Sequence, residues 1–294
     1  MRCSDKFAYL LVVAACTVCS NSSAQGIRIF LDDQLDFELL STKTRKPENI
    51  AGATNELVLS QIKDIDIHYV KSSRKRAFKS IQQTQVPSCI INMIKNEPRK
   101  LRYLFSLPVN FYWAHKLYSH HDLSKASKAV LNAEGEITSL PDLFKVYDSS
   151  AIVIAESFSY GDFLDAQISV VNKENIILRG GADHYETVYR MFISKRVDFS
   201  LNYPSEFHRY SNNINIPVRS YRVAGSPKVV IGQFMCNKTP ESSTFIARVN
   251  EVLLQSYDKE AFLKAHYDYL QASEHKKLKA YIEQYVAPFQ RARN

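Results

Sequence analysis

The sequence predicts an α/β protein, and three observations support that prediction. Short runs rich in β-branched and aromatic residues alternate with segments whose apolar residues recur at helical spacing. The run 151–155 is continuously apolar, which is typical of a parallel strand buried on both faces. The 294 residues are 45% hydrophobic and 23% charged, which suits one large globular domain or two modest ones.

The first third of the chain alternates strands with helices. Its predicted strands cover residues 27–31, 65–70 and 89–94. Residues 55–65 between the first two strands carry leucine, valine and isoleucine at helical spacing. Ser73 is a predicted N-cap for a second helix over residues 74–83, which turns Ala77 and Ile81 inward.

The remainder of the chain continues the pattern and ends in helices. The predicted strands cover residues 151–155, 197–201 and 229–236. The predicted helices cover residues 140–144, 160–170, 187–194, 242–255, 259–270 and 274–285.

The first 25 residues have the pattern of a secretory signal peptide. Arg2 and Lys6 form a basic start, and residues 7–18 are almost entirely apolar. This run is shorter than the roughly 20 residues of a spanning helix. Small residues ending at Ala24 suit cleavage there or close by. Residues 13–16 also resemble a lipoprotein processing box, in which Cys16 would be lipidated, so both processing routes remain open.

Cleavage would change the meaning of the five cysteines. Cys3, Cys16 and Cys19 belong to the leader, so that only Cys89 and Cys236 remain. An even pair in an oxidising compartment is a disulfide candidate. No later apolar run approaches membrane length, so we expect a protein that is soluble or held at a membrane only by lipid.

Common signatures of catalysis and of metal binding are absent from the sequence after the leader. No catalytic residue, metal site or cofactor is therefore predicted. The pair His120-His121 lies in polar surroundings and is interpreted as an exposed loop. The basic cluster 71–76 is interpreted as the solvated start of a helix, without a nucleic-acid partner. The formal charge of +8 favours anionic partners only weakly.

Residues 89–112 are the most informative stretch. A strand leads into a short turn with Arg99 and then into Phe105-Ser106-x-Pro108. This order resembles the bacterial extracellular solute-binding proteins of family 3, the amino-acid-type periplasmic binding proteins. Looser similarities follow in the same order at residues 137–161, 191–202 and 229–269, so the resemblance covers most of residues 26–270.

The resemblance implies a type II periplasmic-binding-protein fold, with two α/β lobes, two crossover strands and a ligand cleft between the lobes. Lobe 1 would comprise residues 26–114 and 226–294, and lobe 2 residues 115–225, after the signal peptide 1–25. Ligands bind at the carboxyl ends of strands and at domain interfaces, and a two-strand hinge allows closure.

The resemblance also implies a set of ligand-binding residues. Arg99 falls where the family places the arginine that grips a ligand carboxylate, to which a guanidinium donates two parallel hydrogen bonds. Asn92 occupies the strand position that contacts ligand hydroxyl or amide groups. Ser157 and Ser159 precede a helix and either bind an anion or act as ordinary caps. Tyr160 either lines the cleft or packs in the core.

Three further points follow from the resemblance. The strands that carry Cys89 and Cys236 would be neighbours, which implies a disulfide that closes a loop around lobe 2. Family members commonly bind the ligand's amino group with an aspartate where this chain has Tyr203, and Glu206 is a possible substitute. The turn from Ser157 to Ser159 has bulkier side chains than the Gly-Thr often found there.

The sequence thus predicts a monomeric periplasmic protein that captures a small polar ligand, amino-acid-like or an organic acid, for an ABC importer. A sensor that signals to a membrane receptor is one alternative. A dehydratase-like enzyme is another, and would use Glu156 or Glu206 as acid and base. A third is an interaction protein whose cleft is filled by its own aromatic residues, given 17 tyrosines and 16 phenylalanines.

Overall fold

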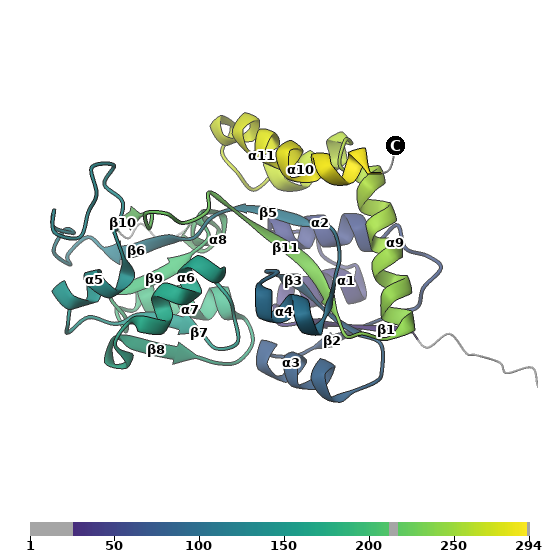
Figure 1. Cartoon of the computed structure of the whole chain (residues 1–294), viewed down its shortest axis with the longest axis horizontal. Helices are drawn as coiled ribbons and strands as arrows, with labels where there is room; N and C mark the ends of the chain where they lie inside the picture. The colour runs from purple at the N-terminus through teal and green to yellow at the C-terminus, as the bar shows by residue number, and fades with distance from the viewer. Residues whose placement is uncertain (1–25, 212–216, 293–294) are drawn as a thin grey trace, which may run out of the picture.

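The protein has two α/β lobes, each built on its own sheet, with chain segments crossing between them (Figure 1). The computed structural model describes residues 26–211 and 217–292. The predicted signal peptide and the lipidation site at Cys16 lie outside the described residues. The two-lobed α/β architecture predicted from the sequence is confirmed.

The first lobe contains a six-stranded mixed sheet. Its strands are β1 (Ile27–Leu31), β2 (Ile67–Lys71), β3 (Ser88–Met93), β4 (Leu104–Phe105), β5 (Asn110–Trp113) and β11 (Val229–Cys236). The order is β2-β1-β3-β11-β4, and β5 pairs with the first half of β11. The strands β1, β2 and β3 are parallel, whereas β11 runs antiparallel to β3, β4 and β5.

The second lobe contains a five-stranded mixed sheet with the order β10-β6-β9-β7-β8. Its strands are β6 (Lys116–His120), β7 (Ile152–Ala155), β8 (Ile176–Arg179), β9 (Phe199–Asn202) and β10 (Val218–Tyr221). Here too three parallel strands are followed by an antiparallel strand and a short edge strand. The two sheets therefore have the same arrangement of parallel and antiparallel strands. They differ in where the central antiparallel strand comes along the chain: β6 is the first strand of the second lobe, whereas β11 is the last strand of the first lobe.

The helices cover the two sheets. In chain order they are α1 (Gln34–Thr42), α2 (Ile50–Leu59), α3 (Arg74–Gln83), α4 (Glu97–Arg102), α5 (Leu140–Val146), α6 (Asp162–Val170), η1 (Lys173–Asn175), α7 (His184–Ile193), α8 (Pro204–Ser211), α9 (Pro240–Ser256), α10 (Glu260–Tyr267) and α11 (Ala272–Arg291). The predicted bounds of α3 are confirmed. The side chain of Ser73 precedes α3 without making a capping hydrogen bond.

The helix α2 begins earlier than its apolar spacing indicated. The side-chain oxygen of Asn49 accepts a hydrogen bond from the Gly52 backbone N–H at 2.6 Å, and this cap starts the helix. The prediction began at residue 55 because the first turn contains alanine, glycine and threonine, which give no hydrophobic periodicity. The helix also ends sooner than predicted, at Leu59.

His120 corrects one sequence-based interpretation. It lies at the end of β6 and is buried, whereas an exposed loop was predicted. Its Nε2 donates to the carbonyl oxygen of Phe192 at 2.7 Å, and the two rings stack with centroids 4.1 Å apart. The strand is only five residues long and half polar, so its sequence gave a weak signal. The neighbouring His121 is exposed.

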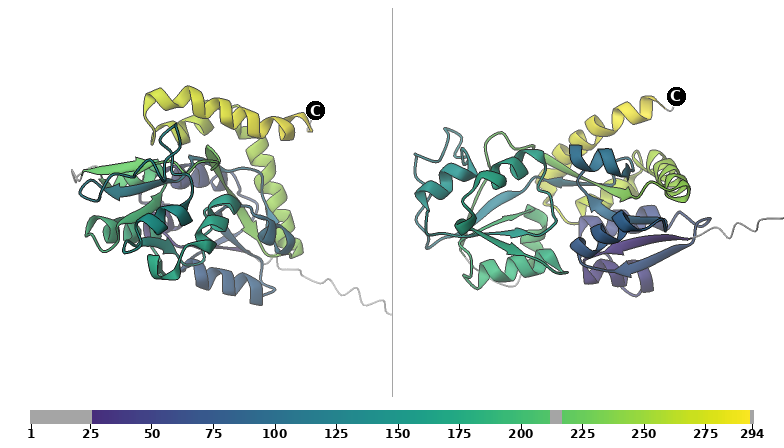
Figure 2. Two further views of the ribbon diagram at one scale, coloured as in Figure 1. Left: turned by 60° about the vertical axis from the view of Figure 1, so that its left-hand side comes forward. Right: turned by 60° about the horizontal axis from the view of Figure 1, so that its bottom comes forward.

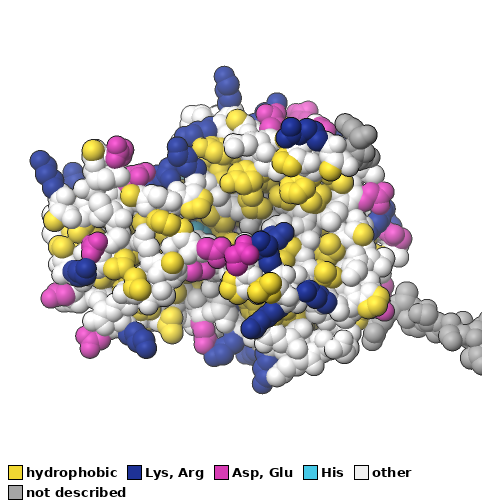
Figure 3. All heavy atoms as spheres, in the orientation of Figure 1, with side chains coloured by type: hydrophobic (Ala, Val, Ile, Leu, Met, Phe, Trp, Pro, Cys, Tyr) yellow, Lys and Arg dark blue, Asp and Glu magenta, His cyan; other side chains and the backbone are white. Residues whose placement is uncertain are grey.

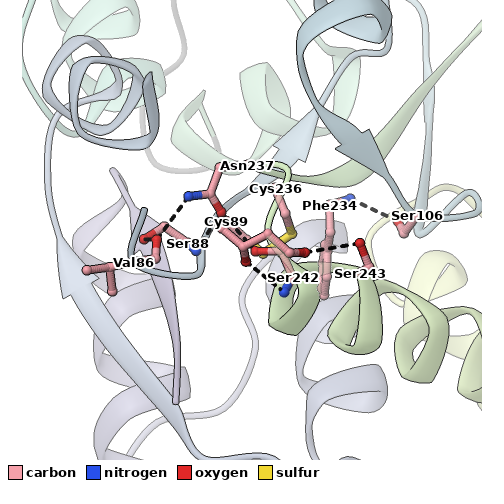
Figure 4. The surroundings of a disulfide bond; sticks show 10 residues. Val86, Ser88, Cys89, Ser106, Phe234, Cys236, Asn237, Ser242 and Ser243 are labelled. Carbon is pink, nitrogen blue, oxygen red and sulfur yellow. Dashed lines mark hydrogen bonds between the residues drawn. A yellow bond between two sulfur atoms is a disulfide. The ribbon is translucent and has the colours of Figure 1, made fainter. Parts of the chain in front are cut away.

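The predicted disulfide between Cys89 and Cys236 is present in the first lobe (Figure 4). The two residues are direct partners in the antiparallel pairing of β3 with β11, and their Cα atoms are 4.0 Å apart. Both side chains are fully buried. Asn237 follows the bridge, and its side-chain oxygen accepts hydrogen bonds from the Ser88 backbone N–H and the Ser242 hydroxyl. The bridge and the Asn237 side chain together connect β3, β11 and the start of α9.

The C-terminal helices belong to the first lobe and lie over the crossover strands (Figure 1). In both views of Figure 2 the end of α11 lies at the outer surface. The ring of Tyr285 packs on Phe111 of β5, with centroids 6.3 Å apart, and Tyr281 packs edge-on against Trp113 at 5.8 Å. Trp113 is the single tryptophan of the sequence. In the described part of the chain, no helix combines the length and apolar character needed to cross a membrane.

Candidate functional site

A small cavity lies between the two lobes. Its volume of about 20 Å³ is room for roughly one water molecule. It is lined by Arg74, Asn92, Met93, Ile94, Arg99, His115, Ser157, Phe158, Ser159, Tyr160, His184, Tyr185, Leu201 and Tyr203. All five residues that the sequence analysis proposed for ligand binding are among them. The cavity is the natural candidate for the ligand site, although its present size excludes an amino acid.

Arg99 reaches this cavity from α4 of the first lobe. Asn96 caps the start of this helix, and its side-chain oxygen accepts from the Arg99 backbone N–H at 3.1 Å. The guanidinium donates from Nη1 to the carbonyl oxygen of Ile94 at 2.9 Å and lies over the ring of Phe78. Among the described residues no carboxylate forms an ion pair with it. Burial, and secondarily the charge of Arg74, lower the pKa of Arg99 to about 10.

Arg74 is a second cation at the cavity, and the sequence analysis missed it. The basic cluster 71–76 was interpreted as a solvated helix start, which is wrong for this residue because Arg74 is buried. Its guanidinium pairs with Asp32 at 2.9 Å and lies 4.5 Å from the ring centroid of Phe158. The available signal was the spacing of Arg74, Ala77 and Ile81, which places all three on the inner face of α3.

Asn92 lines the cavity, but its amide oxygen points into the first lobe. This oxygen accepts hydrogen bonds from the side-chain amides of Asn55 at 2.9 Å and Asn110 at 3.2 Å. The backbone of Asn92 has a φ of 58°, a left-handed conformation that asparagine tolerates better than most residues. The residue therefore shapes the wall of the cavity, while its oxygen is occupied by the neighbouring amides.

The second lobe supplies the loop from Ser157 to Tyr160. The Ser159 hydroxyl donates to Asp165 at 2.5 Å and accepts from the Gly161 backbone N–H at 3.2 Å. The Tyr160 hydroxyl accepts from the Ala155 backbone N–H at 3.1 Å, and its ring is buried. These contacts fix the entry to α6, so both side chains have structural partners as well as a place in the cavity wall.

Two buried histidines stand among aromatic rings at the cavity. His115 stacks on Tyr203, with ring centroids 3.9 Å apart, and His184 packs on Phe158 at 4.1 Å. Burial lowers the pKa of each imidazole to about 3, so both are neutral at ordinary pH. The Nδ1 atom of each ring is buried without a hydrogen-bond partner. The sequence analysis missed both residues because each stands alone in the chain, without a motif.

Charged pairs close the rim between the lobes. Lys75 of the first lobe pairs with Glu156 of the second at 2.6 Å, and Lys71 pairs with Asp183 at 2.9 Å. The Asp183 carboxylate also accepts from the backbone N–H of Gln34 at 2.7 Å. Figure 3 shows acidic and basic side chains adjoining each other on the face that both lobes share. Two residues of the cluster 71–76, Lys71 and Lys75, therefore contact the second lobe.

The carboxylates proposed as acid and base do not line this cavity. Glu156 is held at the rim by Lys75. Glu206 is buried on α8, next to Arg209 at 3.3 Å, and faces a different cavity of about 520 Å³ beside the loop between α10 and α11. Burial raises the pKa of Glu206 to about 7. Glu206 therefore does not replace the aspartate missing at Tyr203, whose ring stacks on His115 and Tyr112.

Comparison with solved structures identifies the fold. A histidine kinase sensor domain with similarity to periplasmic binding proteins aligns with a TM-score of 0.61 and 11% identity, covering 84% of this chain and 96% of that one. A putative L-cystine ABC transporter protein from Listeria monocytogenes aligns with a TM-score of 0.59 and 12% identity, covering 85% and 97%.

A third solved structure is similar over the same extent. The arginine 3rd transport system periplasmic binding protein from Legionella pneumophila aligns with a TM-score of 0.55 and 15% identity, covering 84% of this chain and 99% of that one. No family model matches the sequence, and no curated protein matches it. At these identities the similarity establishes the two-lobed type II periplasmic-binding-protein fold.

Proposed function

We propose that this protein is an exported solute-binding protein that captures a small, polar, carboxylate-bearing ligand between its lobes. The observation that carries the proposal is the guanidinium of Arg99, which lines the interlobe cavity without an ion-pair partner among the described residues. A partly buried cation without an ion-pair partner is costly, and a ligand carboxylate would offset that cost with charge-assisted hydrogen bonds.

Binding requires the lobes to separate first, because the cavity of about 20 Å³ holds no amino acid or organic acid. The two crossover segments, which run from β5 into β6 and from β10 into β11, provide the hinge. The charged pairs at the rim then reform around the ligand. Closure in this way traps the ligand without any chemical step. The solved structures of similar fold include transport binding proteins and a sensor domain.

A membrane partner would recognise the closed form. An ABC importer is our first choice, supported by the transport proteins among the structural neighbours and by the signal-peptide pattern at the start of the sequence. Sensing is the second choice, supported by the histidine kinase sensor domain of similar fold. The lobe boundaries near residues 114 and 225, the periplasmic location and a monomeric state are parts of this proposal.

A binding screen tests the proposal. Amino acids and organic acids are added to the purified protein, and ligand capture is measured as a rise in melting temperature and then by calorimetry. Arg99→Ala should weaken binding of any carboxylate hit by roughly 100-fold, as expected for the loss of a charge-assisted pair. Arg102→Ala is the matched control because it removes an exposed arginine of the same helix. Full affinity in Arg99→Ala would contradict the proposed site.

A further inference from the structure

The ring of Phe158 occupies the space between the two lobes. The residue belongs to the loop after β7 of the second lobe, yet its ring lies 4.5 Å from the Arg74 guanidinium of the first lobe. On its own side it packs on the His184 ring at 4.1 Å. A cation of one lobe and an imidazole of the other therefore hold this aromatic ring, an arrangement favourable for any flat π system.

The loop that carries Phe158 is flanked by two residues with positive φ. Ser157 has a φ of 67° and Gly161 a φ of 92°. A Cβ added at Gly161 would meet no atom within 4 Å, so the backbone conformation, and not a close contact, favours glycine there. The ring is only partly buried. Because hydrogen bonds to Asp165 and Ala155 hold Ser159 and Tyr160 in place, we expect the ring to leave by rotation of the Phe158 side chain.

The carboxylates that surround the cavity are engaged by protein groups. Asp32 pairs with Arg74, and Asp165 accepts from the Ser159 hydroxyl and the Tyr160 backbone N–H. The rim carboxylates of Glu156 and Asp183 pair with lysines. None of these four lines the cavity. Asp162, another carboxylate that acts on Arg99, also lies outside the cavity lining. Because no carboxylate is among the described residues that line the cavity, a ligand ammonium group would lack a direct partner there, whereas Arg99 has no ion-pair partner and can take a ligand carboxylate.

The two histidines add an independent sign of a ligand. The Nδ1 atoms of His115 and His184 are buried at the cavity without a hydrogen-bond partner. Buried polar atoms are usually hydrogen-bonded in folded proteins, and these two nitrogens belong to residues that line the cavity, where a ligand could supply the missing partner. A ligand with a polar group on or beside its ring would satisfy them.

We infer that Phe158 occupies the ring subsite of the cleft and that the ligand is an aromatic carboxylate without an ammonium group. Its ring displaces Phe158 from Arg74, and its carboxylate pairs with Arg99. This inference rests on the proposed function, since it names the class of ligand for the same cleft. Phe158 is then an internal competitor that fills the subsite whenever the ligand is absent.

Three simple acids separate the contributions of ring, charge and ammonium group. Calorimetry on the purified protein would compare the affinity for benzoate with that for cyclohexanecarboxylate, which lacks a π face, and for phenylalanine, which adds an ammonium group. We expect benzoate to bind roughly tenfold more tightly than either of the others. Equal or tighter binding of phenylalanine or of cyclohexanecarboxylate overturns the inference.

Variants of Phe158 test the competition directly. Phe158→Ala should strengthen benzoate binding about tenfold, because the binding-competent state no longer has to form against the internal ring. Phe158→Leu, which fills the space without a π face, should give a smaller gain. Phe163→Ala is the matched control, because Phe163 packs by Gly225 in the same lobe and does not line the cavity. Unchanged or weaker binding in both folded Phe158 variants overturns the inference.

The outcomes also separate this inference from the proposed function. Arg99-dependent binding of aliphatic or amino acids, with benzoate ignored, overturns the choice of an aromatic ligand and leaves the solute-binding role in place. If no carboxylate binds the wild-type protein or the Phe158→Ala variant, the proposed function and this inference both fail.

Discussion

The two lobes share one strand order but differ in what holds them and in what they contribute to the cleft. The first lobe is cross-linked by Cys89–Cys236 and covered by α9, α10 and α11, and it supplies both arginines. The second lobe has no cysteine and supplies all of the aromatic rings that line the cavity. From this difference we infer that the first lobe, which the disulfide cross-links, holds the arginines in fixed positions. The second lobe, which has no such cross-link, can adjust the positions of its aromatic rings.

Removal of the disulfide should have the largest effect on the difference in stability between the two lobes. The bridge joins residues 147 positions apart, which corresponds to about 5 kcal/mol of unfolding free energy in the chain-entropy model. The double variant Cys89→Ala/Cys236→Ala should therefore unfold at much lower urea concentration. Hydrogen exchange should show the loss in β1, β3 and β11, with β6, β7 and β9 protected as before. An equal loss in both lobes would show that they do not differ in this way.

The second largest effect is expected when an aromatic side chain is removed from the core of the second lobe. Phe192 is fully buried and packs on His120 and Phe207. Phe192→Ala should cost about 4 kcal/mol of unfolding free energy, and the exchange pattern should be the reverse of that of the cysteine variant. Leu178→Ala, at an exposed position of the same lobe, should cost less than about 0.5 kcal/mol. A small effect at Phe192 would argue that this lobe is loosely packed.

A pH titration should isolate the stability that the buried His266 contributes to the first lobe. His266 accepts from the Phe111 backbone N–H through Nε2 and donates to Phe262 through Nδ1, which fixes the neutral form. Burial lowers its pKa to about 4, so its contribution is complete above pH 6.5 and is lost as the pH falls towards 4. Between pH 8 and pH 5 the stability advantage over His266→Gln should shrink by about 2 kcal/mol. A constant difference in urea denaturation would refute this assignment.

The smallest expected effect concerns the contact between the lobes. Asp183 binds Lys71 and the Gln34 backbone N–H across the rim, and its φ of 53° is one that asparagine also tolerates. Asp183→Asn should weaken closure by about 1 kcal/mol, visible as a larger radius of gyration in X-ray scattering. Glu186→Gln breaks an ion pair within α7 and serves as the control. An unchanged radius in Asp183→Asn would mean that the rim pairs do not hold the lobes together.

The sequence predicted the strands and helices better than the side chains that line the cleft. Strands such as β11 and helices such as α3 have strong periodicity, and their bounds agree with the prediction. The short strands β5, β6, β8 and β10 were missed because four or five residues of mixed character carry little periodic signal. The disulfide could be expected because the resemblance placed its two strands side by side.

The candidate site shows why side chains are harder to predict than strands. Arg99 was found through a motif, whereas Arg74, His115 and His184 come from three separate parts of the chain and meet only in the folded protein. Glu206 was considered as a possible substitute for the missing aspartate because it is close to Tyr203 along the chain, yet it lies on α8 and lines a different cavity. Proximity in sequence is a poor guide wherever a helix begins between two residues.

The position of β11 also has a consequence for the order in which the protein can fold. The five-stranded sheet is made entirely of residues between Lys116 and Tyr221, so a growing chain can complete it early. The other sheet begins at Ile27 but leaves the edge of β3 unpaired until Val229–Cys236 have been synthesised. The lobe that is started first is therefore finished last. A chain interrupted before residue 229 would carry one complete lobe and one exposed, aggregation-prone strand.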